Sequence, residues 1–265
     1  MSENKNSIIQ ELAMIAHEFR RPIDTISKSA ELVNRARETG TLELDKLAEI
    51  MDGIINSCHR MSLLTSQVTG MAQLENGTFR IMVEKLNVAD FIRDLERLIS
   101  LYEDKKNVKF TFDVHLKNPF AVCDFRKLEK ILLNLISNAV KYSGKTDRRV
   151  AVKVYDEGDD LYFRVRDRGI GIPPAEQENI FKLFYRVEGF STRQTEGCGL
   201  GLTMVKSLTE ALGGAVCVVS REGKGSEFTV KLPRNQDVSP PSKIVEVAYS
   251  YQLYRTSIDE IFSDI

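Results

Sequence analysis

One histidine stands in a sequence context that suits chemistry. His17 begins the run 17–23 (HEFRRPI), and Glu18 directly follows it. A histidine near its unperturbed pKa of about 6.5 is largely neutral at cellular pH and keeps one ring nitrogen available for attack. A neighbouring carboxylate can accept the N–H of the other ring nitrogen, which fixes the tautomer and makes the attacking nitrogen more basic. A lone histidine is more often an ordinary surface residue, so this interpretation depends on the neighbours.

Three polar residues further along the chain recur at helical spacing. Asn134, Asn138 and Lys141 are four and three positions apart, so a helix places them on one face. Carboxamide oxygens suit Mg²⁺, which prefers oxygen ligands and retains waters when it is bound to a nucleotide. The ammonium group of a lysine offers a point charge to phosphate. A plain solvated helix face explains the same spacing, so this pattern does not decide by itself.

Glycine-containing segments follow that helix. Asp167 precedes Gly169 and Gly171, where its carboxylate can accept a hydrogen bond from an exocyclic amine and the glycines let the backbone approach a flat base. The run 197–202 (GCGLGL) precedes a predicted helix, and glycine amides at a helix N-terminus form an anion site. Between them, the polar residues 186–196 are long enough to cover a nucleotide as a lid. Each signal is modest, but their order along one chain is specific.

Two long helices are predicted to carry His17. Apolar residues recur at steps of three, four or seven over residues 8–33 and again over residues 47–71, which indicates helices that pack lengthwise. Gly40 is a stop signal between them, and residues 76–77 are another after the second helix. Because two such helices cannot bury both apolar faces alone, we expect an antiparallel hairpin that dimerises into a four-helix bundle.

From about residue 84 the pattern becomes that of an α+β domain. Alternation and turn signals predict strands over residues 108–114, 149–155, 161–167, 215–220 and 226–232, and helical periodicity predicts helices over residues 88–103, 124–142 and 200–212. Pro173 and Pro174 are expected to open a further helix, because proline suits a first turn. The fold class is therefore α+β, with helices on one face of a mixed or antiparallel sheet.

The chain is expected to divide into three parts. Residues 1–78 form the helical hairpin, residues 79–233 form the α/β sandwich, and residues 234–265 form a linker and tail. Pro240 and Pro241 lie in the linker. A docked helix, an added strand and a disordered end all stay open for the tail.

Composition argues against several classes of partner. The 37 basic and 38 acidic residues give a formal net charge of -1, which argues against nucleic acid. No apolar run approaches the roughly 18 residues of a membrane span, so no membrane contact by this chain is expected. The four cysteines have no metal-ligand spacing, which favours a reduced, cytoplasmic protein and leaves a membrane-anchored parent protein open. We expect the sensor of any stimulus to lie outside this chain.

Together these motifs resemble those of the sensor histidine kinases of two-component systems, over about residues 8–233. Segments similar to the family's boxes are residues 17–23 (phosphoacceptor box), 134–143 (Asn box), 167–172 (first Gly box), 181–186 (Phe box), 197–202 (second Gly box) and 223–226 (last Gly turn). The resemblance implies a dimerisation hairpin followed by a Bergerat-type (GHKL) ATP-binding domain. It also implies ATP and Mg²⁺ as cofactors, a homodimer, and the receiver domain of a response regulator as partner.

The same resemblance assigns roles to individual residues. His17 would be the phosphoacceptor, Glu18 its acid/base partner, and Asn138 the ligand of Mg²⁺. Asp167 would contact adenine, and Lys141 and Tyr142 would reach phosphate. The full set implied for the nucleotide is Asn134, Asn138, Lys141, Tyr142, Asp167, Gly169, Gly171, Ile172, Phe184, Arg186, Gly197, Gly199, Leu200 and Gly201.

Two positions refine this interpretation. Asn134 stands where the gyrase, mismatch-repair and heat-shock ATPases carry a water-activating Glu, which favours transfer to His17 over hydrolysis. Arg21 stands where many of these kinases have a Thr or Asn that positions water, and arginine cannot accept a hydrogen bond from water. Weak phosphatase activity toward the regulator is therefore predicted. The competing hypotheses are a pseudokinase scaffold that binds partners without chemistry, and a plain ATPase.

Overall fold

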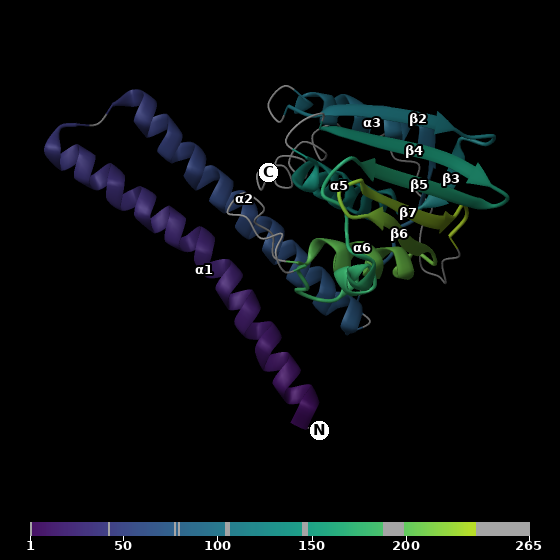
Figure 1. Ribbon diagram of the computed structural model, residues 1–265, viewed down its shortest axis with the longest axis horizontal. Helices are drawn as coiled ribbons and strands as arrows, with labels where there is room; N and C mark the ends of the chain where they lie inside the picture. The colour runs from purple at the N-terminus through teal and green to yellow at the C-terminus, as the bar shows by residue number, and fades with distance from the viewer. Residues whose placement is uncertain are drawn as a thin grey trace.

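The long N-terminal helices form an antiparallel hairpin that projects from an α/β part (Figure 1). The computed structural model describes residues 2–41, 43–76, 78, 80–103, 107–144, 148–187 and 199–236, with side chains from residue 12 onward except at 74 and 75. Helix α1 spans Ser2–Thr39 and helix α2 spans Leu44–Glu75, so both are longer than their apolar patterns indicated. The predicted stop is confirmed, because α1 ends at Thr39 and Gly40 has a φ of 65°.

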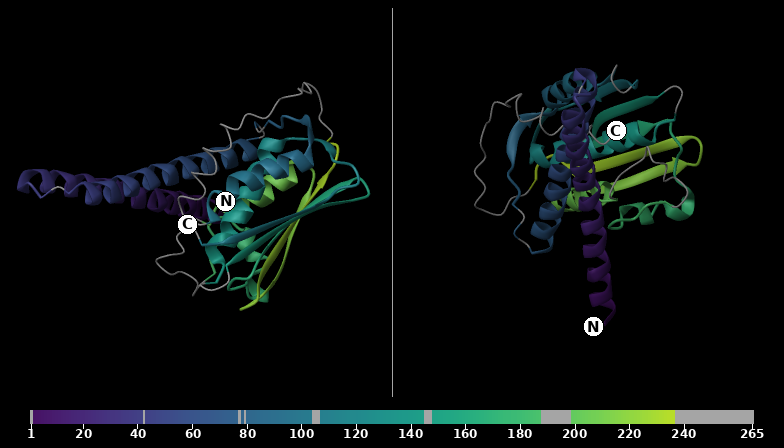
Figure 2. Two further views of the ribbon diagram at one scale, coloured as in Figure 1. Left: turned by 90° about the horizontal axis from the view of Figure 1, so that it is seen from above. Right: turned by 90° about the vertical axis from the view of Figure 1, so that its left-hand side faces the viewer.

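The α/β part contains a five-stranded sheet with the order β2–β4–β5–β7–β6. The strands are β2 (Lys109–His115), β4 (Arg149–Glu157), β5 (Asp160–Asp167), β6 (Ala215–Arg221) and β7 (Gly225–Pro233). The β2–β4 pair is parallel and the other pairs are antiparallel, so the sheet is mixed. Helices α3 (Val88–Ser100), α5 (Phe125–Tyr142) and α6 (Gly201–Ala211) lie on the side of the sheet that faces the hairpin (Figure 2). The predicted α+β architecture is confirmed.

The core lies between this sheet and the helices. Strand residues of alternating position point into it, and Val152 and Phe163 are 1% and 0% exposed. They meet apolar residues of α5, among them the fully buried Leu132. The N-terminus of α5 is capped by Asp124, whose carboxylate accepts hydrogen bonds from the backbone N–H of Lys127 and of Met82. This cap fixes the direction of α5 and therefore the face that it presents at its C-terminal end.

Two short strands were not predicted. β1 (Glu84–Asn87) and β3 (Phe120–Cys123) pair antiparallel in a separate two-stranded sheet. Four residues carry too little alternation to indicate a strand, and this pair is formed by tertiary contact. The prediction of an α-helix after Pro173 and Pro174 is wrong. The segment forms single 3₁₀ turns at Pro174–Glu176 and Asn179–Phe181. Between those turns, Gln177 donates to the carbonyls of Ile172 and Ser220, which ties the segment to β6.

The predicted linker begins within a part of the chain that is still tied to the fold. Arg234 is buried and donates to the carbonyls of Asn118 and Phe120 and to the carboxylate of Asp156. Asn235 forms a parallel bridge with Val122. The ordered α/β part therefore extends to residue 236, the last one that the structure describes, and the predictions for residues 237–265 lie outside the described residues.

Replacement of Arg234 tests whether this end of the chain is part of the fold. Arg234→Met should lower the free energy of unfolding by about 3 kcal/mol, because it leaves the buried carboxylate of Asp156 without its cation. The control is Arg93→Met, which removes an exposed i,i+3 partner of Asp90 and should cost less than about 1 kcal/mol. Urea unfolding measures both, and equal costs would contradict a structural role for Arg234.

Candidate functional site

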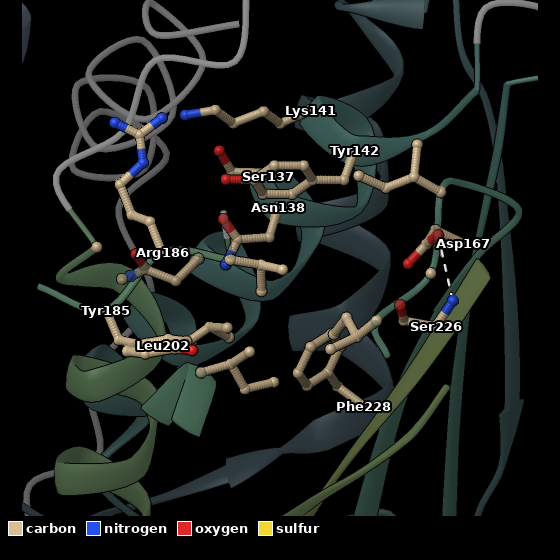
Figure 3. A pocket seen from close by; sticks show the side chains of 18 of the residues that line it. Ser137, Asn138, Lys141, Tyr142, Asp167, Tyr185, Arg186, Leu202, Ser226 and Phe228 are labelled. Carbon is tan, nitrogen blue, oxygen red and sulfur yellow. Dashed lines mark hydrogen bonds between the residues drawn. The ribbon is translucent and has the colours of Figure 1, made fainter. Parts of the chain in front are cut away.

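A cavity lies between α5, the turn after β5, the start of α6 and the hairpin helix α2. Its lining includes ten of the residues predicted for a nucleotide: Asn134, Asn138, Lys141, Tyr142, Asp167, Gly171, Ile172, Arg186, Gly199 and Gly201. Residues separated by up to 67 positions therefore meet at one site, as Asn134 and Gly201 do. Figure 3 shows five of them around one space: Asn138, Lys141, Tyr142, Asp167 and Arg186.

Asp167 forms one end of the cavity. It is 5% exposed, and its Oδ1 accepts hydrogen bonds from the backbone N–H of Gly169, at 2.7 Å, and of Ser226, at 3.3 Å. Burial raises the pKa of this carboxyl above its ordinary value, and the two backbone N–H groups oppose that rise. The carboxylate stands at the cavity edge, so it can accept a hydrogen bond from a ligand with an amino group (Figure 3).

The carboxamides of α5 lie in the middle of the cavity wall. Asn134 Nδ2 donates to the carbonyl of Lys130, at 2.7 Å, so the amide nitrogen is used within the helix. A methyl group added at Gly201 would lie 3.1 Å from Asn134 Oδ1 and 3.8 Å from Asn138 Nδ2. Glycine at the start of α6 therefore leaves the space that these two side chains occupy. The oxygen of Asn134 can accept a hydrogen bond but cannot take up a proton as a carboxylate would.

Two cations lie at the other end of the cavity. Lys141 and Arg186 extend from α5 and from the segment after Phe184, and their charged groups point toward each other (Figure 3). Lys141 Nζ also lies 5.8 Å from the centre of the Tyr142 ring. Like charges in one cavity repel unless an anion lies between them. The cavity therefore has a carboxylate at one end and a cationic site for an anionic group at the other.

Three predicted residues are not among those that line the cavity, and one cannot be placed. Gly169 packs closely against the backbone of Tyr142 and donates to Asp167, so it supports the site from behind. Phe184 and Leu200 are buried in a second apolar cluster with Leu64 of α2. Their side chains pack in that cluster and are not among those that line the cavity. Gly197 and most of the predicted lid lie outside the described residues.

The hairpin also contributes to this site, which the sequence did not reveal. Leu63 and Gln67 of α2 line the cavity, and Gln67 is 5% exposed. Nothing in the helical periodicity distinguishes them, because their contact with the cavity depends on how the hairpin packs. Ser226 and Phe228 of β7 line the cavity as well. The turn before Ser226 was recognised as a motif, and the alternation along β7 could have indicated that Phe228 shares its face.

His17 is exposed on α1. Ile15 and Phe19, two positions to either side of it, pack against the cluster of Leu64, Phe184 and Leu200. The helix that carries His17 is thereby joined to the flanks of the cavity. Glu18 points elsewhere, because its carboxylate is bonded to Arg60 of α2 at 3.1 Å.

A metal ion in this cavity would be held by amide oxygens of the protein and by the phosphates of a bound nucleotide. In the described part of the chain, no group of three or more His, Cys, Asp or Glu residues could hold a metal ion. Asn138 lies in the cavity between the carboxylate end and the cationic end (Figure 3). One amide oxygen and the phosphates of a nucleotide fit Mg²⁺, which is commonly held by few protein ligands and several waters. Within the same described residues, no helix is long and apolar enough to cross a bilayer.

Two family models match the chain, one over each part. Residues 123–236 match the family described as histidine kinase-, DNA gyrase B- and HSP90-like ATPase, which defines the class of the α/β part. Residues 7–77 match the His Kinase A (phospho-acceptor) domain. A curated relative is the aerobic respiration control sensor protein ArcB of Escherichia coli (strain K12), which is 32% identical over 83% of this chain. The chain therefore belongs to the sensor histidine kinases, and it spans 28% of the length of ArcB.

Solved structures agree on the fold. Full-length ShkA in complex with AMPPNP is 27% identical with a TM-score of 0.62, covering 88% of this chain and 47% of ShkA. The histidine kinase ThkA in complex with the response regulator protein TrrA is 23% identical, with a TM-score of 0.62, covering 88% of this chain and 64% of that one. The order of hairpin and α/β part is thus shared with these proteins.

Two neighbouring glycines test how closely the backbone packs around the cavity. Gly171 and Gly223 have φ values of 70° and 72°, but a methyl group at Gly171 would overlap the backbone of Arg221 whereas one at Gly223 meets nothing within 4 Å. Gly223→Ala should cost about 1 kcal/mol for its backbone conformation. Gly171→Ala should cost at least about 2 kcal/mol more, because backbone has to move. Equal unfolding free energies in urea would show that this packing is wrong.

Proposed function

We propose that this chain is the core of an ATP-dependent protein-histidine kinase that phosphorylates His17 and passes the phosphoryl group to an aspartate of a response regulator. The observation that carries the proposal is the charge asymmetry of the cavity. Asp167 at one end suits the exocyclic amine of adenine, and Lys141 and Arg186 at the other suit the phosphates. Membership of the family supports the use of ATP.

Mg²⁺ is proposed to bind beside Asn138. Asn138 would hold the ion there through its amide oxygen, and the ion would supply positive charge that offsets the negative charge developing during phosphoryl transfer. Asn134, on the same face of α5, supports transfer over hydrolysis, because its amide cannot activate water as a general base. Tyr142 and Gly199 complete the wall toward the phosphates.

The proposed reaction is an in-line displacement on the γ-phosphate. A ring nitrogen of neutral His17 attacks phosphorus, a P–N bond forms, and the bond to the bridging oxygen of ADP breaks. Glu18 accepts the proton that the other ring nitrogen holds, or shares it through a hydrogen bond. The side chain of His17 is exposed on α1, so its ring nitrogen is accessible to a bound nucleotide.

A homodimer follows from the surface of the hairpin. Large apolar side chains of α1 and α2 remain exposed in the single chain, including Leu12 at 60%, Leu32 at 55% and Ile55 at 46%. Soluble proteins rarely leave many large apolar side chains uncovered, and a second hairpin would bury those that face it in a four-helix bundle. We propose residues 1–78 as this dimerisation and phosphotransfer domain and residues 79–233 as the ATP-binding domain.

The proposed partners are those of the family. We propose that a receiver domain docks on the hairpin near His17. ThkA, which shares the fold, has been solved in complex with a response regulator protein. An upstream sensor would supply the signal. ArcB is much longer than this chain, which is consistent with further domains in the parent protein.

Labelling with γ-³²P-ATP and Mg²⁺ tests the proposed activity. Wild-type protein should acquire acid-labile, base-stable label, and His17→Gln should lose it because the attacking nitrogen is gone. The matched controls are His59→Gln and His115→Gln, which remove the other two histidines of the chain and should keep the label. Absence of label would leave the scaffold hypothesis, and steady phosphate release independent of His17 would favour a plain ATPase.

Asp167 should set both the affinity and the pH dependence of nucleotide binding. Asp167→Asn should weaken ATP binding about 10-fold or more, since a hydrogen bond to a buried charge is lost. Because the pKa of Asp167 is raised, the affinity of the wild type for ATP should fall as the pH drops through that raised value. The affinity of Asp167→Asn should not show this fall, because the variant has no carboxylate to protonate. Calorimetric titration measures both, with Asp160→Asn at the other end of β5 as control. Equal affinities of wild type and Asp167→Asn would exclude the proposed adenine contact.

Arg21 should limit the hydrolysis of the phosphoaspartate on the regulator. It is 42% exposed and lies 3.9 Å from Glu18 in a weak i,i+3 pair, where it cannot orient a water for attack on a phosphoaspartate. Arg21→Thr should therefore raise the rate at which the protein dephosphorylates its regulator, by about 10-fold. Rapid dephosphorylation by the wild type, with no gain in Arg21→Thr, would overturn this prediction.

A further inference from the structure

The carboxylate next to the phosphoacceptor is engaged on the inner side of the hairpin. Arg60 Nη2 of α2 lies 3.1 Å from Glu18 Oε2, and the two side chains are only 11% and 12% exposed. Arg21 Nη1 lies 3.9 Å from the other oxygen, Oε1. His17, the preceding residue of α1, is exposed. Each oxygen of Glu18 therefore faces an arginine.

Helix geometry separates Glu18 from His17 in this arrangement. Successive residues point about 100° apart around a helix, so side chains at i and i+1 do not face each other. A carboxylate that is bonded to Arg60 across the hairpin cannot at the same time reach a ring nitrogen of the exposed His17. Glu18 can act on His17 only after its side chain leaves Arg60.

The hydrogen bond between Arg60 and Glu18 is strong enough to hold the carboxylate in place. A guanidinium–carboxylate hydrogen bond is charge-assisted, and it is stronger where water is largely excluded. Arg60 lies on α2 and Glu18 on α1, so a shift of α1 relative to α2 changes this contact. Removal of the arginine would release the carboxylate, whereas lysine would retain part of the attraction.

We propose that Arg60 is a positioning residue that holds Glu18 in a resting position, and that release of Glu18 from Arg60 precedes phosphoryl transfer to His17. The consequence for the reaction rests on the proposed function. The arrangement of Arg60, Glu18 and His17 is a property of the hairpin alone and can be tested without any activity.

The pKa of His17, followed by NMR of histidine-labelled full-length protein, tests the arrangement directly. The signals of the three histidines are assigned with single His→Gln variants. In Arg60→Gln the freed carboxylate should stabilise the imidazolium and raise the pKa of His17 by about half a pH unit or more. Loss of the positive charge of Arg60 also acts at long range, so the same substitution is made in Glu18→Gln, where the rise should be much smaller. Equal rises in the two backgrounds would overturn the proposal.

Single-turnover autophosphorylation at saturating Mg-ATP tests the consequence. Arg60→Gln should accelerate labelling of His17 about threefold or more, and Arg60→Lys should return the rate toward that of the wild type. In the Glu18→Gln background the acceleration should vanish, and ADP affinity should not change in any variant. Lys46→Gln removes a charge from an exposed position of the same helix and is the control for net charge.

The outcomes separate this proposal from the proposed function. If wild-type protein takes no label on His17, the function fails and the NMR cycle still decides on Arg60. If wild-type protein is labelled but Arg60→Gln is slower or unchanged, the resting position is contradicted while the function stands. Arg60→Met, which keeps the apolar stem of the side chain, replaces Arg60→Gln in both experiments if circular dichroism shows that Arg60→Gln is unfolded.

Discussion

A buried carboxylate that must remain hydrogen-bonded organises this site. Asp167 ends β5 with little access to water, and a charge in such a position is costly unless donors surround it. Its partners are the backbone N–H groups of Gly169 and of Ser226, so the end of β5, the turn after it and the start of β7 are fixed relative to one another. The same burial raises its pKa and leaves an acceptor at the cavity edge. Two glycines pack directly against it, because a Cβ at Gly225 would lie 2.2 Å from the carbonyl oxygen of Asp167 and one at Gly169 would lie 2.8 Å from its Oδ1.

Side-chain contacts connect the hairpin to the nucleotide cavity. Leu64 of α2 packs with Phe184 and Leu200, which flank the cavity, and α1 joins the same cluster through residues on either side of His17. Gln67 of α2 reaches the cavity itself. A change in the hairpin therefore alters the wall of the cavity, and a shift of Phe184 or Leu200 alters the packing of the helix that carries His17. The Arg60–Glu18 ion pair lies between the same two helices of the hairpin.

The sequence predicted the parts of this protein that local pattern determines. Period-two alternation located all five strands of the main sheet, and helical spacing brought Asn134, Asn138 and Lys141 to one face of α5. The four-residue strands β1 and β3 escaped notice because they exist only as a pair. Phe184 was assigned to the nucleotide by its motif, whereas its side chain packs against the hairpin, a contact that depends on tertiary structure.

The same limit applies to Glu18. Adjacency in sequence suggested that it orients His17, but the spacing of a helix turns neighbouring side chains apart and Arg60, distant in sequence, holds the carboxylate. Gln67 is a further example, because only the packing of α2 brings it to the cavity. Residues that meet through the packing of whole elements carry no local signal.

A crystal structure of this chain with a non-hydrolysable ATP analogue and Mg²⁺ tests the central claim most directly. The account predicts that the exocyclic amine of adenine donates to the carboxylate of Asp167, that Asn138 contacts the metal ion, and that the phosphates lie between Lys141 and Arg186. A nucleotide bound outside this cavity, or one reversed so that its phosphates face Asp167, would contradict it.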